Sequence, residues 1–196
     1  MSIVCVSDAD LVTRARQGDP DAFGELVDRH QAAVYRAALA ALGSPADAED
    51  AAQDALLLAY RRLDTFRGDA SFKTWLLTIT WHQAINRRRG LAALWRRIAA
   101  PTTADEGEDA IAAVAAGGPS PEAAAAHDQL RRGIGGAIRA LSPKLRDALL
   151  LAQAGDYSYE EIGAMLRAPV GTIKWRVSEA RRLIRKRLQE QGHGDV

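Results

Sequence analysis

The sequence predicts an all-α fold of two small helical domains joined by a flexible linker. Alanine, the strongest helix former, is abundant, and the Ala-rich segments contain few β-branched residues. Apolar residues recur at intervals of three and four positions on both sides of a stretch rich in Pro, Gly and acidic residues. The chain has 196 residues, which is enough for two small domains of this kind.

Four helices are expected before the linker, and capping and turn residues mark their ends. Ser7 or Asp8 can cap the first helix, and a Gly-Asp-Pro sequence then breaks it. Gly43 stands where a helix stop is expected, and Ser44 with the Pro that follows it begins the third helix. Ser71 caps the fourth helix after a loop over residues 64–70. The expected helices span residues 8–17, 21–42, 45–63 and 72–89.

Residues 91–121 differ in composition from the rest of the chain and are typical of a linker. They contain Pro101, an acidic cluster and a Gly-Gly-Pro sequence, while residues 91–98 and 110–116 could form transient helical turns. From composition alone, the acidic cluster of Asp105, Glu106, Glu108 and Asp109 is explained by a solvated tether. Beyond the linker, helices are expected at residues 122–141, 143–153, 158–166 and 170–189.

The net charge of +1 conceals four blocks of alternating sign. Residues 1–58 carry a net charge of −6 and residues 91–127 one of −3, whereas residues 59–90 and 128–196 each carry +5. Local basicity of this kind is typical of proteins that bind nucleic acid, although charged helix surfaces are the plainer explanation.

Composition also argues against several classes of protein. No apolar run approaches the roughly 18 residues of a membrane span, and no secretory signal is recognisable, so we expect no membrane insertion. Cys5 is the only cysteine, which excludes an internal disulfide and favours a cytoplasmic setting. No metal-ligand spacing, phosphate loop or nucleophile–base pair stands out. We therefore expect a protein without metal, cofactor or catalytic activity of its own.

The strongest local pattern predicts a helix-turn-helix near the C-terminus. Ser158 and Glu161 match a capping box, and residues 167–169 match the turn. One face of the following helix is apolar, at positions 173, 177, 180 and 184. The other face carries Trp175 among basic residues, which suits a DNA major groove and its phosphates. The alternative is a basic amphipathic helix that binds only protein.

The third expected helix has an acidic face. Asp47, Asp50 and Asp54 lie roughly opposite its apolar side, beside Leu57 and Leu58, both of which we expect to point outward. This face is poor for DNA but suits a protein partner with a basic and apolar surface. An ordinary solvated face is the alternative.

The fourth expected helix carries a stripe of aromatic and polar residues. Trp75, His82, Asn86 and Arg89 share this stripe, and Phe66 lies in the loop just upstream. Aromatic rings beside cations can hold the unstacked bases of single-stranded DNA. The alternative is packing in the core, which we favour for Phe72 and leave open for Trp75.

Taken in chain order, these segments resemble the extracytoplasmic-function sigma factors of bacterial RNA polymerase. Residues 63–76, with Ala48-Glu49-Asp50 and Gln53 upstream, resemble the second conserved region of that family. Residues 158–162, 171–174 and 180–181 resemble its fourth region. The resemblance covers nearly the whole chain except the linker.

The resemblance implies a specificity subunit of RNA polymerase, with residues 1–90 as the region 2-like domain, 91–121 as the linker and 122–196 as the region 4-like domain. The expected partners are core polymerase, through its β′ clamp helices and β flap, promoter DNA and an anti-sigma factor. The linker is expected to run toward the active site and the RNA exit path. The residues expected to bind core polymerase are Asp47, Glu49, Asp50, Gln53, Asp54, Leu57 and Leu58.

The resemblance also implies two sets of DNA contacts. The loop matching residues 66–71 captures a flipped base of the −10 element in the family. The residues expected at the −10 element are Phe66, Arg67, Ser71, Trp75, His82, Arg87, Arg88 and Arg89. Those expected at the −35 element are Gly171, Thr172, Lys174, Trp175, Arg176, Ser178, Arg182 and Lys186.

Two positions depart from the family pattern. His82 stands where the family often has Asn, and Trp175 stands where a small residue is common, so base preference at both elements is left open. Two other functions also fit parts of the sequence. A sigma-like decoy that only sequesters an anti-sigma factor would not need the basic residues, and a stand-alone helix-turn-helix regulator would not need the acidic face.

Overall fold

The computed structural model describes residues 6–98, 121–154 and 157–192, and these form helices without a single strand, which confirms the all-α prediction. The chain divides into two compact units near residue 104, and we describe each by itself. The linker residues 99–120, including the acidic cluster, lie outside the described residues.

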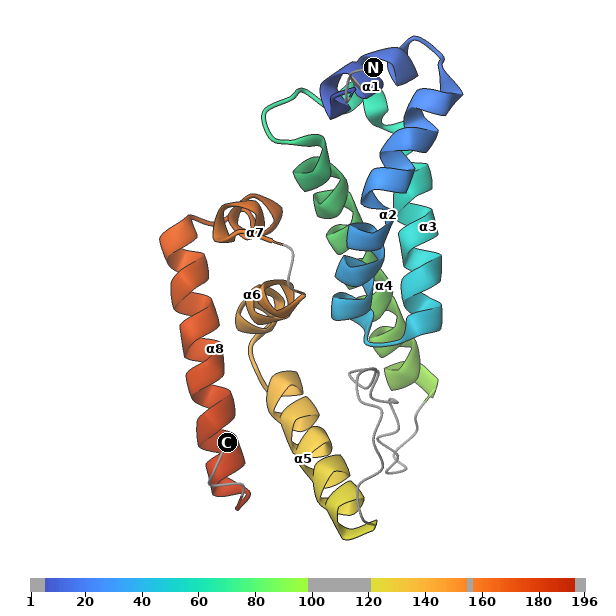
Figure 1. Ribbon diagram of the computed structural model, residues 1–196. Helices are drawn as coiled ribbons and strands as arrows, with labels where there is room; N and C mark the ends of the chain where they lie inside the picture. The colour runs from blue at the N-terminus through green and yellow to red at the C-terminus, as the bar shows by residue number, and fades with distance from the viewer. Residues whose placement is uncertain (1–5, 99–120, 155–156, 193–196) are drawn as a thin grey trace. The chain divides into compact units, whose positions relative to one another are not determined.

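The first unit is built around three long helices (Figure 1). Helices α2, α3 and α4 pack against one another, and the short α1 packs on α2 and on the 3-10 turn η1. This arrangement places the loop after η1 beside the N-terminal helix. The elements are α1 (Asp8–Arg16), α2 (Pro20–Leu42), α3 (Pro45–Arg61), η1 (Leu63–Thr65) and α4 (Phe72–Ile98).

Local sequence signals account for the ends of these helices. Ser7 caps α1 in a capping box with Asp10, and the Asp19 side chain accepts hydrogen bonds from two amides at the start of α2. Gly43 ends α2 with a φ of 75°, a left-handed conformation that glycine adopts without strain. Ser44 then caps α3. The expected boundaries of α1 and α2 are therefore confirmed to within about two residues.

Small side chains dominate the core of the first unit where α2 meets α3. Ala38 of α2 packs in one buried cluster with Ala48 and Ala51 of α3, and their exposed fractions are 0%, 0% and 2%. Larger residues fill the rest of the core, among them Leu26, Val34, Leu76, Leu77 and Trp81. Alanine at the contact allows two helix backbones to approach closely, since the distance between axes depends on the side chains between them.

The fourth helix is longer than the sequence predicted. It continues past the expected end near Arg89 to Ile98, so residues 91–98 belong to α4 and are not transient turns in a linker. Gly90 alone does not break the helix, because the Leu-Ala-Ala-Leu sequence that follows has high helix propensity. The third helix differs in the other direction, since α3 ends at Arg61 and the chain turns through η1.

The second unit consists of α5 (Pro121–Arg139), α6 (Pro143–Gln153), α7 (Tyr159–Leu166) and α8 (Val170–Glu190), which match the four expected helices closely. Helix α8, drawn in red in Figure 1, packs on each of the other three. Leu151, Ile162, Met165, Ile173 and Val177 are buried between these helices. The apolar face that the sequence predicted for α8 is therefore its core face.

The turn between α7 and α8 has a tightly defined geometry. Ser158 and Glu161 form the expected capping box at the start of α7. Helix α7 ends at Leu166. Its C-cap residue Arg167 has a φ of 49°, and the Ala168 amide donates to the Gly163 carbonyl at 2.9 Å. A Cβ atom on Gly163 would lie 2.8 Å from the Ala168 carbonyl oxygen, so only glycine fits there. These contacts form the helix-turn-helix that the sequence predicted.

Candidate functional site

The exposed side of α3 is acidic and ends in an exposed leucine. Glu49, Asp50, Gln53 and Asp54 are exposed and Asp47 is half-buried. Leu57 has an exposed fraction of 56%, but Leu58 is half-buried, so the expectation of two outward leucines is right for Leu57 only. Leu58 lies at the boundary between the buried and the exposed side of α3, so its side chain is only partly exposed.

An arginine from α4 neutralises part of this acidic face. The Arg87 Nη2 atom lies 2.8 Å from Asp50 Oδ2 and 3.3 Å from Asp47 Oδ1, and Nη1 lies 3.9 Å from Asp54 Oδ2. The hydrogen bond that Arg87 donates to Asp50 raises the pKa of Arg87 above its ordinary value. The sequence placed Arg87 at the −10 element and gave no sign of this contact, because the partners are 37 and 40 residues apart.

The three consecutive arginines of α4 point in different directions. Successive residues of a helix are rotated by about 100°. Arg87 reaches α3, the Arg88 Nη1 atom donates to the Ala41 carbonyl at 3.1 Å, and Arg89 is exposed. Two of the three therefore hold α4 to its neighbours within the first unit.

Phe66 belongs to an aromatic cluster at the start of α4. Its ring centroid lies 5.8 Å from that of Phe72 and 5.4 Å from that of Trp75. Phe72 is buried, which confirms the expectation of a core residue, whereas Phe66 and Trp75 are half-buried. Half-buried rings keep part of their surface available to a ligand while their position is fixed by packing.

The loop around this cluster is open to solvent. Arg67, Ser71 and, further along α4, His82 are exposed. Gly68 has a φ of 79°, so the loop uses a left-handed residue at its turn. The structure thus brings Phe66 and Trp75 together, with Arg67 and Ser71 in the same loop. His82 lies seven residues after Trp75, about two turns further along α4.

The exposed face of α8 is basic and carries an outward tryptophan. Trp175 has an exposed fraction of 61%, as the sequence predicted. The other predicted −35 residues line the same helix: Gly171, Lys174, Ser178, Arg182 and Lys186 are exposed, and Thr172 and Arg176 are half-buried.

Ion pairs within α8 hold some of these basic side chains. Arg182 donates two hydrogen bonds to Glu179, at 2.8 and 2.7 Å, and Lys186 Nζ lies 3.8 Å from Glu190 Oε1. The hydrogen bonds from Arg182 lower the pKa of Glu179, so this carboxylate stays ionised at neutral pH. Arg182 must leave or share Glu179 to contact a phosphate or a base.

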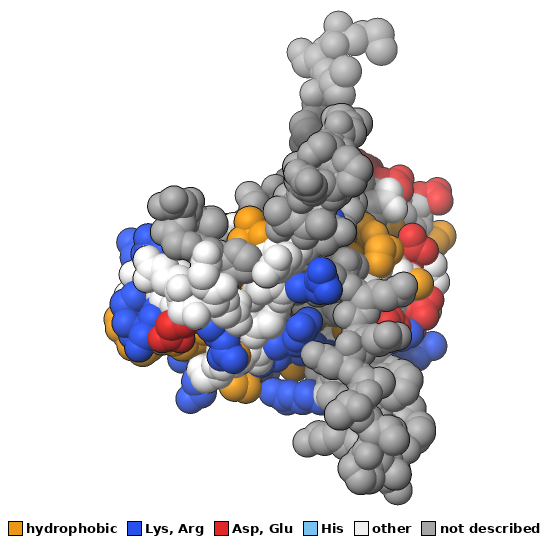
Figure 2. Space-filling model, turned by 90° about the horizontal axis from the view of Figure 1, so that it is seen from below, with side chains coloured by type: hydrophobic (Ala, Val, Ile, Leu, Met, Phe, Trp, Pro, Cys, Tyr) orange, Lys and Arg blue, Asp and Glu red, His pale blue; other side chains and the backbone are white. Residues whose placement is uncertain are grey.

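The charged regions are visible in the view of Figure 2. Acidic side chains gather at one edge of the first unit, and most of the charged side chains visible on the second unit are basic. Within the described residues, no cluster of His, Cys, Asp or Glu is arranged to hold a metal ion, and no helix is both long and apolar enough to span a membrane.

Next to the acidic face lies a shallow apolar groove that the sequence did not reveal. Phe23 and Val27 of α2 line it together with Leu56, Leu57 and Tyr60 of α3. The Phe23 and Tyr60 ring centroids lie 4.9 Å apart, and Tyr60 has an exposed fraction of 51%. The pairing of Phe23 with Tyr60 depends on the packing of α2 on α3.

Comparison with known families matches both units. Residues 26–94 match the family Sigma-70 region 2, and residues 131–184 match Sigma-70, region 4. The chain is 36% identical over 191 residues to the RNA polymerase sigma-H factor of Pseudomonas aeruginosa, covering 93% of this chain and 94% of that protein. It is 38% identical over 192 residues to the ECF RNA polymerase sigma-E factor of Escherichia coli K12, covering 94% and 95%.

Solved structures give the same result. The sigma factor RpoE in complex with the anti-sigma factor NepR from Bartonella quintana matches with a TM-score of 0.61 and 25% identity, covering 85% of this chain and 96% of that one. CnrH in complex with the cytosolic domain of CnrY matches with a TM-score of 0.61 and 23% identity, covering 93% and 97%. The second likeness concerns the fold alone.

Proposed function

The chain belongs to the extracytoplasmic-function sigma factors of bacterial RNA polymerase, and on that premise we propose how its surfaces divide the work of initiation. As a sigma factor it binds core RNA polymerase and directs promoter recognition, promoter melting and the start of transcription. It acts by binding, and we place its work in the cytoplasm together with the polymerase.

One observation carries the proposal: a single chain holds an acidic helix face in one unit and a basic helix-turn-helix in the other. A repressor needs only the second surface, and a decoy for an anti-sigma factor needs only the first. A protein that brings polymerase to DNA needs both. This combination favours the sigma factor over the two alternatives.

We assign the acidic face of α3 to core polymerase. The residues are Asp47, Glu49, Asp50, Gln53, Asp54, Leu57 and Leu58, and the expected partner element is the β′ clamp helices. Support comes from the exposed carboxylates beside an exposed leucine, a combination that suits a basic and apolar protein surface. Arg87 acts here as a counter-ion within the first unit, and release of Arg87 toward DNA on polymerase binding would reconcile this contact with its predicted −10 role.

We assign the aromatic loop to one unpaired base of the −10 element. Phe66 and Trp75 supply a half-buried ring surface. Exposed polar groups come from Arg67 and Ser71 in the loop and from His82 and Arg89 further along α4. Bases stack on such rings, and the gain from stacking offsets the cost of taking a base out of the duplex.

We assign the exposed face of α8 to the −35 element. The second helix of a helix-turn-helix enters the major groove with its N-terminal residues nearest the base edges. In α8 these are Gly171, Thr172, Lys174 and Trp175. Arg176, Ser178, Arg182 and Lys186 follow along the helix and suit phosphates. The β flap is the expected contact of this unit on the polymerase.

We propose an anti-sigma factor as a further partner. The related RpoE structure is a complex with an anti-sigma factor, and the apolar groove between α2 and α3 leaves Leu57 and Tyr60 exposed. An apolar patch next to a charged rim is typical of a surface that a protein covers.

Run-off transcription with core polymerase and a library of promoters tests the proposed function. The full chain should direct transcripts from a subset of promoters that share a −35 and a −10 sequence. A decoy would give no transcripts yet would still bind an anti-sigma factor. A stand-alone regulator would bind DNA without core polymerase and would not raise transcription from any promoter in the library.

A further inference from the structure

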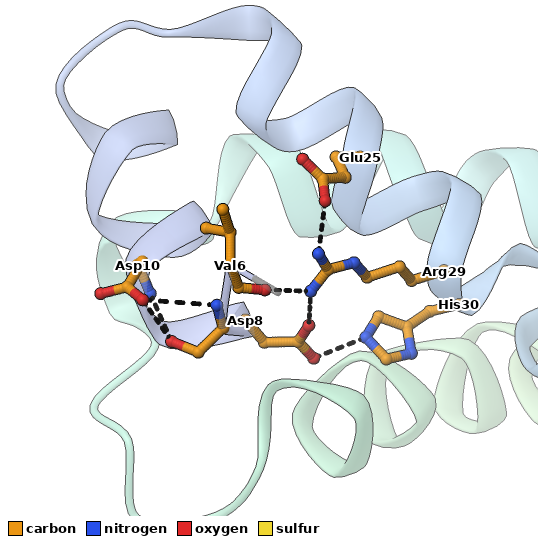
Figure 3. A network of polar contacts seen from close by, with 7 residues as sticks. Val6, Asp8, Asp10, Glu25, Arg29 and His30 are labelled. Atoms are coloured by element: carbon orange, nitrogen blue, oxygen red, sulfur yellow. Dashed lines mark hydrogen bonds and ion pairs between the residues drawn. The ribbon is translucent and has the colours of Figure 1, made fainter. Parts of the chain in front are cut away.

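The N-terminal helix α1 is fixed to α2 by a network of polar contacts at its start (Figure 3). The Asp8 carboxylate accepts a hydrogen bond from Arg29 Nη1 at 3.0 Å and lies 2.7 Å from His30 Nε2. The same Arg29 nitrogen donates to the Val6 carbonyl at 2.7 Å, and Arg29 also pairs with Glu25. The start of α1 is therefore held in one position on α2.

The end of α1 is held as well. The Arg14 guanidinium donates two hydrogen bonds to Asp19, at 2.9 and 2.7 Å, and the guanidinium lowers the pKa of that carboxyl. Leu11, Val12 and Ala15 are buried beneath the helix. With both ends fixed and one face buried, α1 is a rigid support for whatever its last turn contacts.

The last turn of α1 contacts the loop that carries Phe66. The Arg16 Nε and Nη2 atoms donate to the Leu63 carbonyl at 3.2 and 2.9 Å, and Nη2 also donates to the Phe66 carbonyl. The centre of the guanidinium lies 6.0 Å from the Phe66 ring centroid, at the limit of a cation–π contact. Arg16 thus binds the backbone on both sides of the turn and touches the ring that the turn presents.

This contact has a specific geometric effect. The planar guanidinium fixes the Leu63 and Phe66 carbonyls relative to each other, and an ammonium group cannot do this with the same fork. The Phe66 ring in turn rests on Phe72 and Trp75 at the start of α4. The position of Phe66 is therefore set from two sides, by α4 through its ring and by α1 through its backbone.

We infer that Arg16 is a positioning residue for base capture: it presets the loop so that an unpaired base of promoter DNA meets the Phe66 ring in its final place. The inference rests on the proposed −10 role of this loop. Arg16 itself touches no base in this scheme. A preset loop spares the ordering cost that a free loop would incur on binding.

The test is a double-mutant cycle in which Arg16 is substituted and a promoter base is removed, singly and together. It uses holoenzyme assembled from core polymerase and the full chain. Promoters carry an abasic site at each position of the −10 non-template strand in turn, and the rate of opening is followed by permanganate reactivity. With wild type, one position should show a penalty of about tenfold. Arg16→Gln should slow opening of the intact promoter by about tenfold. At the sensitive position, Arg16→Gln should reduce the abasic penalty to less than about twofold, because the base no longer meets an ordered ring.

Two further variants separate positioning from folding. Arg14→Gln removes a neighbouring arginine whose hydrogen bonds go to Asp19 and not to the loop. The buried apolar face of α1 and the contact of Asp8 with Arg29 still hold this helix, so the variant should keep the full abasic penalty. Arg16→Lys keeps the charge and one donor group, so it folds like the wild type and should fall between wild type and Arg16→Gln. Thermal unfolding and core binding of each variant are measured beside the opening rate.

The outcomes distinguish base capture by the loop from positioning of the loop by Arg16. If wild type shows no penalty at any abasic position, base capture by this loop is refuted, and the role of Arg16 with it. If wild type shows the penalty and both Arg16 variants keep it in full, the loop captures a base but Arg16 does not position it. A reduced penalty with unchanged core binding supports the inference.

Discussion

The two charged helix faces of this sigma factor differ in where the ion-pair partners of their charged side chains come from. On α3, the carboxylates are bridged by Arg87, which comes from α4 and is 37 residues along the chain from Asp50, the carboxylate that it binds at the shortest distance. On α8, Arg182 and Lys186 pair with Glu179 and Glu190 of the same helix, three and four residues away. The α3 face therefore exists as a unit only after the first unit has folded, whereas the α8 face is complete within a single helix.

This difference has a functional meaning. A basic side chain held by a neighbour on its own helix can exchange that partner for a phosphate without moving any other element. The bridge from Arg87 to α3 joins two helices, so a partner that displaces Arg87 also changes the contact between α3 and α4. Binding at the α3 face can therefore change the packing of α3 on α4 in the first unit. Binding at the α8 face changes only side chains of α8.

The largest expected effect comes from reversing the acidic face. Replacing Asp47, Asp50 and Asp54 by Lys should weaken core binding by at least about a hundredfold, since three attractive contacts with a basic surface become repulsive. Co-purification with core polymerase measures this loss, and circular dichroism checks that the helices persist. Arg87→Gln is the matched control: it removes the counter-ion, keeps the carboxylates and should bind core at least as well as wild type. Unchanged core binding by the triple variant contradicts the assignment of this face.

A smaller effect is expected in the aromatic loop. Phe66→Ala should leave core binding intact and reduce permanganate reactivity of the melted promoter by about tenfold, because the unpaired base loses its stacking surface. Phe66→Tyr keeps the ring and serves as the control, with nearly normal melting. Normal melting by the Ala variant would show that Phe66 only packs against Phe72 and Trp75.

On α8, Arg182→Ala should weaken DNA binding by about five- to tenfold at low salt. If Arg182 contacts a phosphate, the loss is uniform across sequences. The slope of log affinity against log salt concentration then decreases in magnitude by about one. If it reaches a guanine edge, the loss is confined to promoters that carry that base. Titration of holoenzyme on a set of −35 variants at several salt concentrations separates these outcomes. Identical binding by variant and wild type at every salt concentration removes Arg182 from the interface.

The smallest expected effect tests the local pairing itself. Glu179→Gln releases Arg182 and removes one negative charge from the basic face, so affinity for DNA should rise about two- to threefold with little change in sequence preference. The double variant Glu179→Gln with Arg182→Ala should bind no better than Arg182→Ala alone if the gain comes through Arg182. A gain that persists in the double variant would instead reflect the change in overall charge.

Local sequence signals were enough to predict most of the fold. The cap at Ser7, which was one of two candidates, the capping box at Ser158 and the stop at Gly43 depend on residues within four positions of each other, and all three are confirmed. The predicted end of the fourth helix at residue 89 was wrong, because the strong helix formers after Gly90 continue α4 to Ile98. Pattern and caps thus define where helices begin better than where a favourable run of residues will stop.

The candidate sites were predictable to the extent that they lie on one helix. Trp175 was expected on the outward face of α8, and its exposure confirms this. The contacts of Arg87 with Asp50 and of Arg16 with the Phe66 carbonyl join residues 37 and 50 positions apart, and no periodicity in the sequence announces them. The assignment of these residues to polymerase or DNA stays a prediction.

The alanines between α2 and α3 have a consequence for how this protein can change during evolution. Ala38, Ala48 and Ala51 are buried together where α2 meets α3, so a larger side chain there has no room unless the helices move apart. Because the acidic face and the apolar groove are both built on these helices, such a shift would reach the partner surfaces as well. Selection therefore has more freedom to vary exposed residues outside the acidic face, such as Tyr60, than the small residues between the helices. A lineage could acquire a new regulator by substituting exposed residues, while the spacing of the two helices stays the same.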